Sequence, residues 1–246
     1  MIETGFHTLS DGRRIAFRGI GGAGPAVVFL PGYKSDMSGS KAAALIEWAA
    51  ANGRSCLLFD YSGCGESPGD FADGTLSRWR EEAVALIGAL TTGPVVLVGS
   101  SMGGWLMLLV ARELGARVAG LVGIAAAPDF TDWGYDEGQK ARLAGGETLL
   151  LDSAYGPEPT PVHPGFWADG QALRQLGEAI PIDCPVRLLH GQEDGDVPAE
   201  ISLRLAEALR SQDVQVTLVK GGDHRLSREQ EIALLLRTVE SLCGAS

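Results

Sequence analysis

Short apolar runs alternate with amphipathic stretches along most of the chain after residue 25. A continuous apolar run of five to eight residues, bounded by turn formers, is typical of a strand that is buried on both faces of a sheet. Such strands are predicted at Ala26–Leu30, Cys56–Asp60, Val95–Gly99, Val118–Ala125, Val186–His190 and Val214–Lys220. Helical spacing is clearest in Ser77–Leu90, and the other predicted helices are Lys41–Ala51, Met102–Leu114, Ile201–Leu209 and Arg228–Leu242.

The first 25 residues follow a different pattern. Phe6–Leu9 and Arg14–Arg18 flank Asp11-Gly12, a dipeptide that favours a hairpin turn. Because strands and helices then alternate, we expect one α/β domain over residues 1–246. Its predicted architecture is a mostly parallel central sheet with helices on both faces and an N-terminal antiparallel hairpin.

Residues 128–181 interrupt the alternation. The segment is rich in glycine, proline and aromatic residues and contains only short helical patterns. An insertion before the next sheet strand is a common place for an active-site lid, so we expect a lid here. Its proposed substrate contacts are Trp133, Tyr155, Phe166 and Trp167. The alternative is a satellite cluster that covers a sheet edge.

The composition of the chain argues against several classes of function. The 246 residues carry a formal charge of −11, which argues against binding to nucleic acid or to an anionic membrane. The four cysteines form no Cys-x-x-Cys pair and no cluster with histidine, so neither a metal nor a cofactor is expected. Residues Met1 to Arg14 lack the apolar core of a signal peptide, and we therefore expect a cytoplasmic protein. The uncharged stretch from Ala83 to Ala111 is broken by Gly93-Pro94, which disfavours membrane insertion.

The candidate nucleophile is Ser101, in the pentapeptide Gly99-Ser100-Ser101-Met102-Gly103. This motif lies between a predicted strand and a predicted helix, where a tight turn exposes the hydroxyl beside backbone N–H donors. The pentapeptide alone is a weak signal, because a serine helix cap flanked by packing glycines would have the same sequence.

An acid and a base follow the serine in the chain. Asp194 comes after the strand at Val186–His190, with Asp196 as the alternative acid, and His224 follows the last predicted strand. The carboxyl ends of parallel strands meet at one edge of the sheet, so these side chains can converge there. His190, at the end of its strand, is interpreted as a hydrogen-bonded structural residue.

A tetrahedral oxyanion needs two hydrogen-bond donors. One candidate is the backbone N–H of Met102, at the positive end of the helix that follows the serine. The other is the N–H of Tyr33, because Pro31-Gly32-Tyr33 follows the first parallel strand and glycine permits a close approach.

These segments together resemble the α/β-hydrolase superfamily. The similar stretches are LPGYKSDMSGSKA, FDYSGCGES, GSSMGGW, IPIDCPVRLLHGQEDGDVP and DHR, and they extend over nearly all of the chain after residue 25. The resemblance implies an α/β-hydrolase fold with a Ser101, Asp194 and His224 triad. It is greatest to serine hydrolases described as acyl-protein thioesterases and acyl-glucuronide esterases. One departure is Pro31-Gly32, where the family usually has His-Gly.

The sequence therefore predicts a serine hydrolase that cleaves carboxylic esters or thioesters through an acyl-enzyme. Expected substrates are small acyl esters, acyl thioesters or acylated proteins. Two other interpretations stay open. Asp129, Asp132, Asp136 and Glu137 in the insertion would suit an aminopeptidase-type amide hydrolase, and a non-catalytic ligand-binding protein could share the fold. The pattern gives no oligomeric state.

Overall fold

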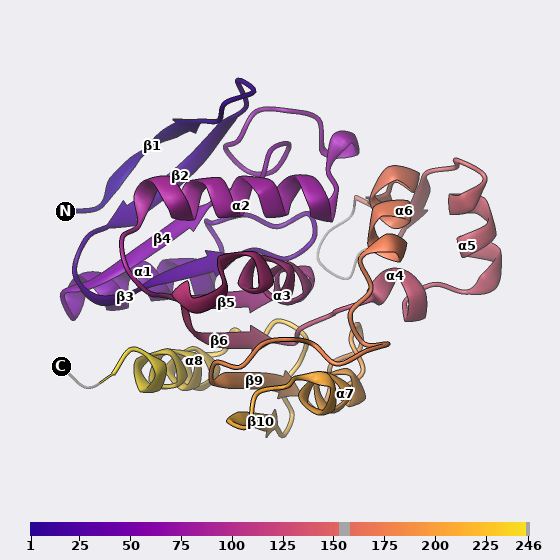
Figure 1. Ribbon diagram of the computed structural model, residues 1–246. Helices are drawn as coiled ribbons and strands as arrows, with labels where there is room; N and C mark the ends of the chain where they lie inside the picture. The colour runs from indigo at the N-terminus through magenta and orange to yellow at the C-terminus, as the bar shows by residue number, and fades with distance from the viewer. Residues whose placement is uncertain (153–157, 245–246) are drawn as a thin grey trace.

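The computed structural model describes residues 1–152 and 158–244. The centre of the fold is an eight-stranded sheet (Figure 1). The strand order is β1-β2-β4-β3-β5-β6-β9-β10. The β1/β2 and β2/β4 pairs are antiparallel and the remaining pairs are parallel, which confirms the predicted hairpin and the mostly parallel sheet. The strands are β1 Glu3–Thr8, β2 Arg14–Ile20, β3 Ala23–Leu30, β4 Arg54–Phe59, β5 Val95–Ser100, β6 Val118–Ile124, β9 Val186–Gly191 and β10 Val214–Val219.

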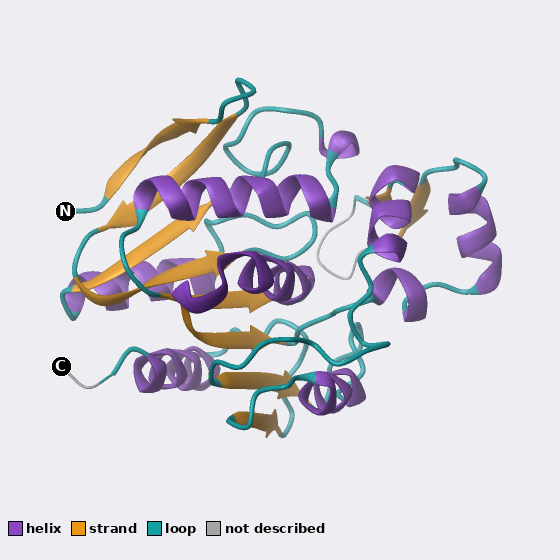
Figure 2. Cartoon of the chain, viewed as in Figure 1, coloured by secondary structure: helices purple, strands orange, loops and turns teal. Residues whose placement is uncertain are grey.

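Helices cover both faces of the sheet, because the central strands present apolar side chains to both. In β3, Val28 faces the core layer under α2 and α3, while Val27 and Phe29 face the layer under α1 and α8. Figure 2 shows the helices on the two sides of the strands. Their bounds are α1 Ser40–Ala51, α2 Leu76–Leu90, α3 Met102–Leu114, α7 Glu200–Ala208 and α8 Glu229–Leu242, with short 3-10 turns η1 at Phe71–Asp73 and η2 at Gly115–Arg117.

The chain between β6 and β9 forms a separate group of short elements beyond the carboxyl ends of the parallel strands (Figure 1). Its helices are short, as predicted, but the small antiparallel pair β7/β8 was not predicted. Each of its strands has three residues, too few for an alternating pattern to be recognised. The elements are α4 Phe130–Trp133, α5 Glu137–Ala144, β7 Leu149–Leu151, β8 Thr160–Val162 and α6 Pro164–Ala172.

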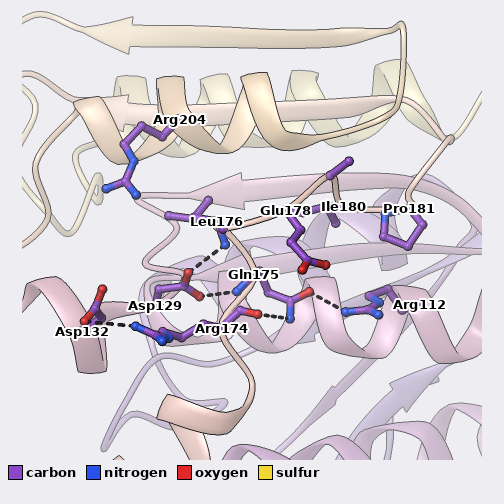
Figure 3. A pocket seen from close by; sticks show the side chains of 12 residues that line it. Arg112, Asp129, Asp132, Arg174, Gln175, Leu176, Glu178, Ile180, Pro181 and Arg204 are labelled. Atoms are coloured by element: carbon purple, nitrogen blue, oxygen red, sulfur yellow. Dashed lines mark hydrogen bonds and ion pairs between the residues drawn. The ribbon is translucent and has the colours of Figure 1, made fainter.

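Asp129 joins the two ends of this insertion. Its carboxylate accepts the backbone N–H groups of Gln175, at 2.7 Å, and Leu176, at 2.8 Å (Figure 3). Burial raises the pKa of Asp129, against the opposing effect of these hydrogen bonds. The side chain therefore holds the outgoing and returning segments of the insertion together.

Two glycines set the packing of the turn between β5 and α3. A Cβ on Gly103 would lie 2.0 Å from the carbonyl oxygen of Leu30, and one on Gly99 would lie 2.3 Å from the carbonyl oxygen of Gly103. Real Cβ atoms do not approach backbone oxygens this closely. The first turn of α3 can therefore pack against the end of β3 only when these positions lack a side chain.

We expect Gly103→Ala to destabilise the protein, because the new methyl group would force backbone apart in a closely packed layer. The expected cost is about 1–3 kcal/mol of unfolding free energy, measured by urea unfolding. Gly88→Ala is the matched control, since a Cβ at this position in α2 would meet nothing within 4 Å. That variant should be neutral or more stable by up to about 1 kcal/mol. Equal stability of the two variants would contradict the packing argument.

Candidate active site

Ser101 occupies a strained backbone conformation between β5 and α3. Its φ of 55° and ψ of −120° are unfavourable for a residue with a Cβ. Three hydrogen bonds hold the residue there: its N–H donates to Ile124 O at 2.9 Å, and its carbonyl accepts from Gly104 N at 2.8 Å and Ala127 N at 3.0 Å. The serine side chain is consequently presented at the carboxyl end of the sheet.

His224 links Ser101 to Asp194. The Nε2 atom of His224 lies 3.1 Å from Ser101 Oγ, and its Nδ1 atom lies 2.9 Å from Asp194 Oδ2. The carboxylate can only accept, so Nδ1 carries the hydrogen and Nε2 presents its lone pair to the serine hydroxyl. The structure thus brings together the three side chains that the sequence proposed, although they are separated by 123 and 30 positions along the chain.

The Asp194 carboxylate is almost fully enclosed, with its side chain 1% exposed. Burial alone would raise its pKa, but hydrogen bonds from His190, His224 and the N–H of Val197 outweigh burial and hold the pKa of Asp194 well below its ordinary value. The carboxylate is therefore ionised throughout the neutral range. Asp196, the alternative acid, is exposed, and its own N–H donates to Asp194 Oδ1 at 2.9 Å.

The loop that carries His224 is fixed on several sides. Asp223 Oδ1 accepts the backbone N–H groups of Arg225, at 3.1 Å, and Leu226, at 3.0 Å. Leu226 has a φ of 42° and is buried in the layer under α1 and α8. From α1, Lys41 Nζ donates to Arg225 O at 2.6 Å. These contacts restrict the position of the imidazole relative to Ser101.

The two proposed oxyanion donors lie on either side of the serine. Met102 is the first residue of α3, and Tyr33 follows Gly32, where a Cβ would lie 3.4 Å from Ser101 Cβ. Within residues 1–152 and 158–244, neither the Met102 nor the Tyr33 N–H donates to a backbone acceptor. Their role as an oxyanion hole stays a prediction.

The aromatic residues proposed to contact substrate have different environments. The Trp133 indole donates to Pro128 O at 2.8 Å, and the Trp167 indole donates to Thr131 O at 3.0 Å, both from half-buried side chains. Phe166 is 1% exposed and packs in the main core, with its ring 4.6 Å from that of Tyr33. Tyr155 lies outside the described residues. Phe166 therefore packs inside the protein, and the substrate contacts of all four stay a prediction.

The sequence did not reveal how the loop after β3 is attached to the insertion. The Tyr33 hydroxyl donates to Pro161 O at 2.9 Å, and Lys34 Nζ donates to Pro159 O at 3.4 Å. The Tyr33 ring also contacts Phe71, with centroids 5.0 Å apart. No pattern in the sequence identifies these contacts, because each joins segments more than 35 residues apart.

The structure also contains a polar pocket of about 420 Å³ at the base of the insertion (Figure 3). Arg112, Arg174 and Arg204 reach it from three segments, and Asp129, Asp132 and Glu178 balance their charge. None of the three candidate triad residues lines it. The pocket is therefore distinct from the candidate active site.

One set of potential metal ligands overlaps with the triad. Oxygen and nitrogen atoms of Asp194, Asp196 and His224 lie within 4.8 Å of one another. Both Asp194 oxygens and both ring nitrogens of His224 already have hydrogen-bond partners in the protein. This donor set is consequently better suited to proton transfer than to metal binding.

Comparison with known proteins identifies the class that this fold and site define. Residues 27–237 match the family model described as the Alpha/beta hydrolase family. The chain belongs to this family and is a hydrolase by class, as the motifs suggested.

Curated relatives of this chain carry a more specific name than the family does. Human palmitoyl-protein thioesterase ABHD10, mitochondrial, is 37% identical over 234 residues, which cover 93% of this chain and 76% of the relative. The mouse protein of the same name is 39% identical over 242 residues, covering 96% of this chain and 81% of the relative.

Solved structures of similar proteins have the same fold over nearly the whole chain. The crystal structure of a protein from Agrobacterium vitis S4 is 41% identical to this chain, with a TM-score of 0.93, and the match covers 99% of this chain and 100% of the other. Mouse alpha/beta hydrolase domain-containing protein 10 is 35% identical with a TM-score of 0.91, covering 98% of both chains. Within its described part, this chain has no helix long and apolar enough to cross a membrane.

Lys41 gives a testable dependence of stability on pH. Burial lowers the pKa of Lys41 to about 8, whereas an unfolded chain has a lysine pKa of about 10.4. Between these values the unfolded state binds more protons, so this group makes the protein more stable as pH rises from about 8 to about 10. The gain disappears as pH falls through about 8.

The expected result is that wild type gains unfolding free energy relative to Lys41→Met between about pH 8 and about pH 10. Urea unfolding at a series of pH values measures it, and taking the difference between the two proteins cancels the groups that they share. Parallel pH curves would show that Lys41 does not titrate as described.

Proposed function

We propose that this protein is a serine hydrolase that cleaves acyl thioesters and carboxylic esters through an acyl-enzyme. The observation that carries the proposal is the continuous hydrogen-bonded series from Ser101 Oγ through His224 to Asp194. A serine hydroxyl is weakly nucleophilic by itself, and an adjacent base oriented by a carboxylate is what activates it.

In the first half of the reaction, Ser101 Oγ attacks the carbonyl carbon while His224 Nε2 takes the hydroxyl proton. The ionised Asp194 carboxylate stabilises the resulting imidazolium without itself becoming protonated. Collapse of the tetrahedral intermediate breaks the bond to the thiol or alcohol, which receives the proton from His224. In the second half, water attacks the carbonyl carbon of the acyl-serine while His224 takes its proton. Collapse of the second tetrahedral intermediate breaks the bond to Ser101 Oγ, which receives the proton from His224, and the acid is released.

The negative oxygen of each intermediate would accept hydrogen bonds from the N–H groups of Met102 and Tyr33. Two features support this assignment: both groups have no backbone acceptor among the described residues, and Met102 begins a 13-residue helix. Because these donors are backbone atoms, the Pro31-Gly32 sequence does not prevent them from acting.

We assign the insertion over residues 128–181 as a lid that contributes to the acyl-binding site. Its attachment to Tyr33 and Lys34 supports this assignment, because those two residues directly follow the glycine beside Ser101. Trp133, Tyr155, Phe166 and Trp167 are the proposed contacts for an apolar acyl group. The name of the relatives, palmitoyl-protein thioesterase, favours a thioester substrate, on a small molecule or on an acylated protein. The cytoplasmic location stays a prediction, since those relatives are named mitochondrial.

The acidic residues of the insertion do not favour amide hydrolysis. Asp129 uses both oxygens for backbone N–H groups, Asp136 accepts from Gln139 N, and Asp132 pairs with Arg174 at 3.3 Å. Glu137 pairs with Lys140 at 3.0 Å. Each carboxylate thus has a partner within the protein, so the features that suggested an aminopeptidase are explained by structure. A ligand-binding protein would have no need of the complete Ser101–His224–Asp194 series.

The nucleophile can be identified by covalent labelling. A fluorophosphonate probe should label the wild-type protein at Ser101, and Ser101→Ala should lose both labelling and turnover, by about a millionfold for the latter. Ser100→Ala is the matched control and should still be labelled, because Ser100 is a buried residue of β5. Labelling that persists in Ser101→Ala would exclude this serine as the nucleophile.

The leaving group can be tested with a substrate series. We expect acyl thioesters and p-nitrophenyl esters of graded chain length to be hydrolysed in a Ser101-dependent manner. Aminoacyl-naphthylamides should be poor substrates, because the four carboxylates that could bind their amine, Asp129, Asp132, Asp136 and Glu137, each have a partner within the protein. Turnover of naphthylamides in preference to both ester classes would contradict the proposed substrate class.

A further inference from the structure

A second histidine contacts the candidate triad acid. His190, near the end of β9, has no exposed surface, and its Nε2 atom lies 3.3 Å from Asp194 Oδ2. The same nitrogen lies 2.9 Å from Val197 O, while Nδ1 lies 2.7 Å from the hydroxyl of Ser202 in α7. The mechanism described above does not use this buried imidazole.

The partners of His190 determine its tautomer. A backbone carbonyl and a carboxylate only accept hydrogen bonds, so Nε2 must carry a hydrogen that lies between Val197 O and Asp194 Oδ2. In the neutral ring Nδ1 is then an acceptor, and the Ser202 hydroxyl donates to it. Ser202, also without exposed surface, supports the tautomer in which the ring N–H faces Asp194, because its hydroxyl can donate to Nδ1.

All of these contacts restrain the same carboxylate. Asp194 Oδ1 accepts N–H groups from Asp196, at 2.9 Å, and Val197, at 2.8 Å, while Oδ2 lies 2.9 Å from His224 Nδ1 and 3.3 Å from His190 Nε2. A rotation of the carboxylate would break at least one of these bonds. Among the described residues, Asp194 is the one charged group within hydrogen-bond distance of His190.

We propose that His190 is a positioning residue for the triad: its Nε2–H holds Asp194 Oδ2 toward His224, and the Ser202 hydroxyl supports the required tautomer by donating to Nδ1. The inference rests on the proposed function, since it assigns His190 a role only if Asp194 is the triad acid. His190 itself does not contact the reacting atoms. It acts by fixing the direction and the charge distribution of the carboxylate that orients His224.

This role differs from that of a buried side chain that only fills the loop between β9 and α7. A hydrogen bond to a carboxylate spreads its negative charge, so removal of the donor leaves more charge facing His224. The His224 imidazolium is then favoured, and the acidic limb of the activity profile moves to higher pH. Loss of packing alone would lower stability and leave this limb where it was.

The test compares His190→Leu, which removes the donor, with His190→Gln, which keeps an N–H donor on a side chain of similar reach. The readout is the second-order rate of fluorophosphonate labelling of Ser101 from about pH 5 to about pH 9. For His190→Leu we expect the rate to fall by about ten- to a hundredfold, as for loss of a hydrogen bond to a charged group. Its acidic limb should move to higher pH, and His190→Gln should recover most of the rate.

Ser202→Ala provides a second test that leaves the imidazole in place. We expect a smaller loss of labelling rate in the same direction, because the buried Nδ1 acceptor of the required tautomer then loses its donor. Thermal unfolding shows whether each variant is folded at the assay temperature. If His190→Leu is not folded, the comparison of Ser202→Ala and His190→Gln with wild type decides the question.

Two further variants separate this inference from the proposed function. Absence of labelling in wild type would contradict the proposed function itself, and labelling unaffected by Asp194→Asn would contradict the assignment of Asp194 as the triad acid. If Asp194→Asn abolishes labelling but the folded His190 and Ser202 variants keep the wild-type rate and acidic limb, the positioning role of His190 is wrong and the triad stands.

Discussion

The candidate site depends on the close approach of two backbone segments at the carboxyl end of the sheet. The first turn of α3 lies directly against the end of β3, and the contact between Gly103 and the Leu30 carbonyl allows no side chain between them. This contact sets where the Met102 N–H lies relative to the loop that carries Tyr33. Beside this contact, the chain passes through the strained conformation of Ser101, which Ile124, Gly104 and Ala127 hold by hydrogen bonds. The backbone geometry thus determines the positions of the serine Cα and of both proposed oxyanion donors.

Much of this architecture could be predicted because its signals are local. The continuous apolar run at Val95–Gly99 and the Gly-x-Ser-x-Gly pattern after it identify a buried strand and a turn without reference to any other segment. Asp194 and His224 could be proposed because each directly follows a predicted parallel strand, and such strand ends share one edge of the sheet. The observed strands and helices begin and end within a few residues of the predicted ones.

The features that escaped prediction depend on contacts between distant segments. The β7/β8 pair is too short to show a period, and the bonds from Tyr33 and Lys34 to the insertion leave no pattern in either segment. Phe166 could be recognised as an aromatic residue of the insertion, but its place in the main core depends on the docking of α6. Sequence could name His190 as a hydrogen-bonded residue, whereas its contact with Asp194 follows from the path of the loop between β9 and α7.

The electrostatic arrangement separates two roles that one carboxylate must fill. In the proposed mechanism Asp194 has to remain ionised in a nearly closed environment, and it has to keep a fixed direction while His224 gains and loses a proton. Hydrogen bonds from Asp196, Val197 and His190 satisfy its oxygens, so burial does not neutralise it. His190 is suited to this position because a neutral imidazole supplies a donor without adding a charge that would compete with the His224 imidazolium. A lysine or arginine there would neutralise the carboxylate and weaken its effect on His224.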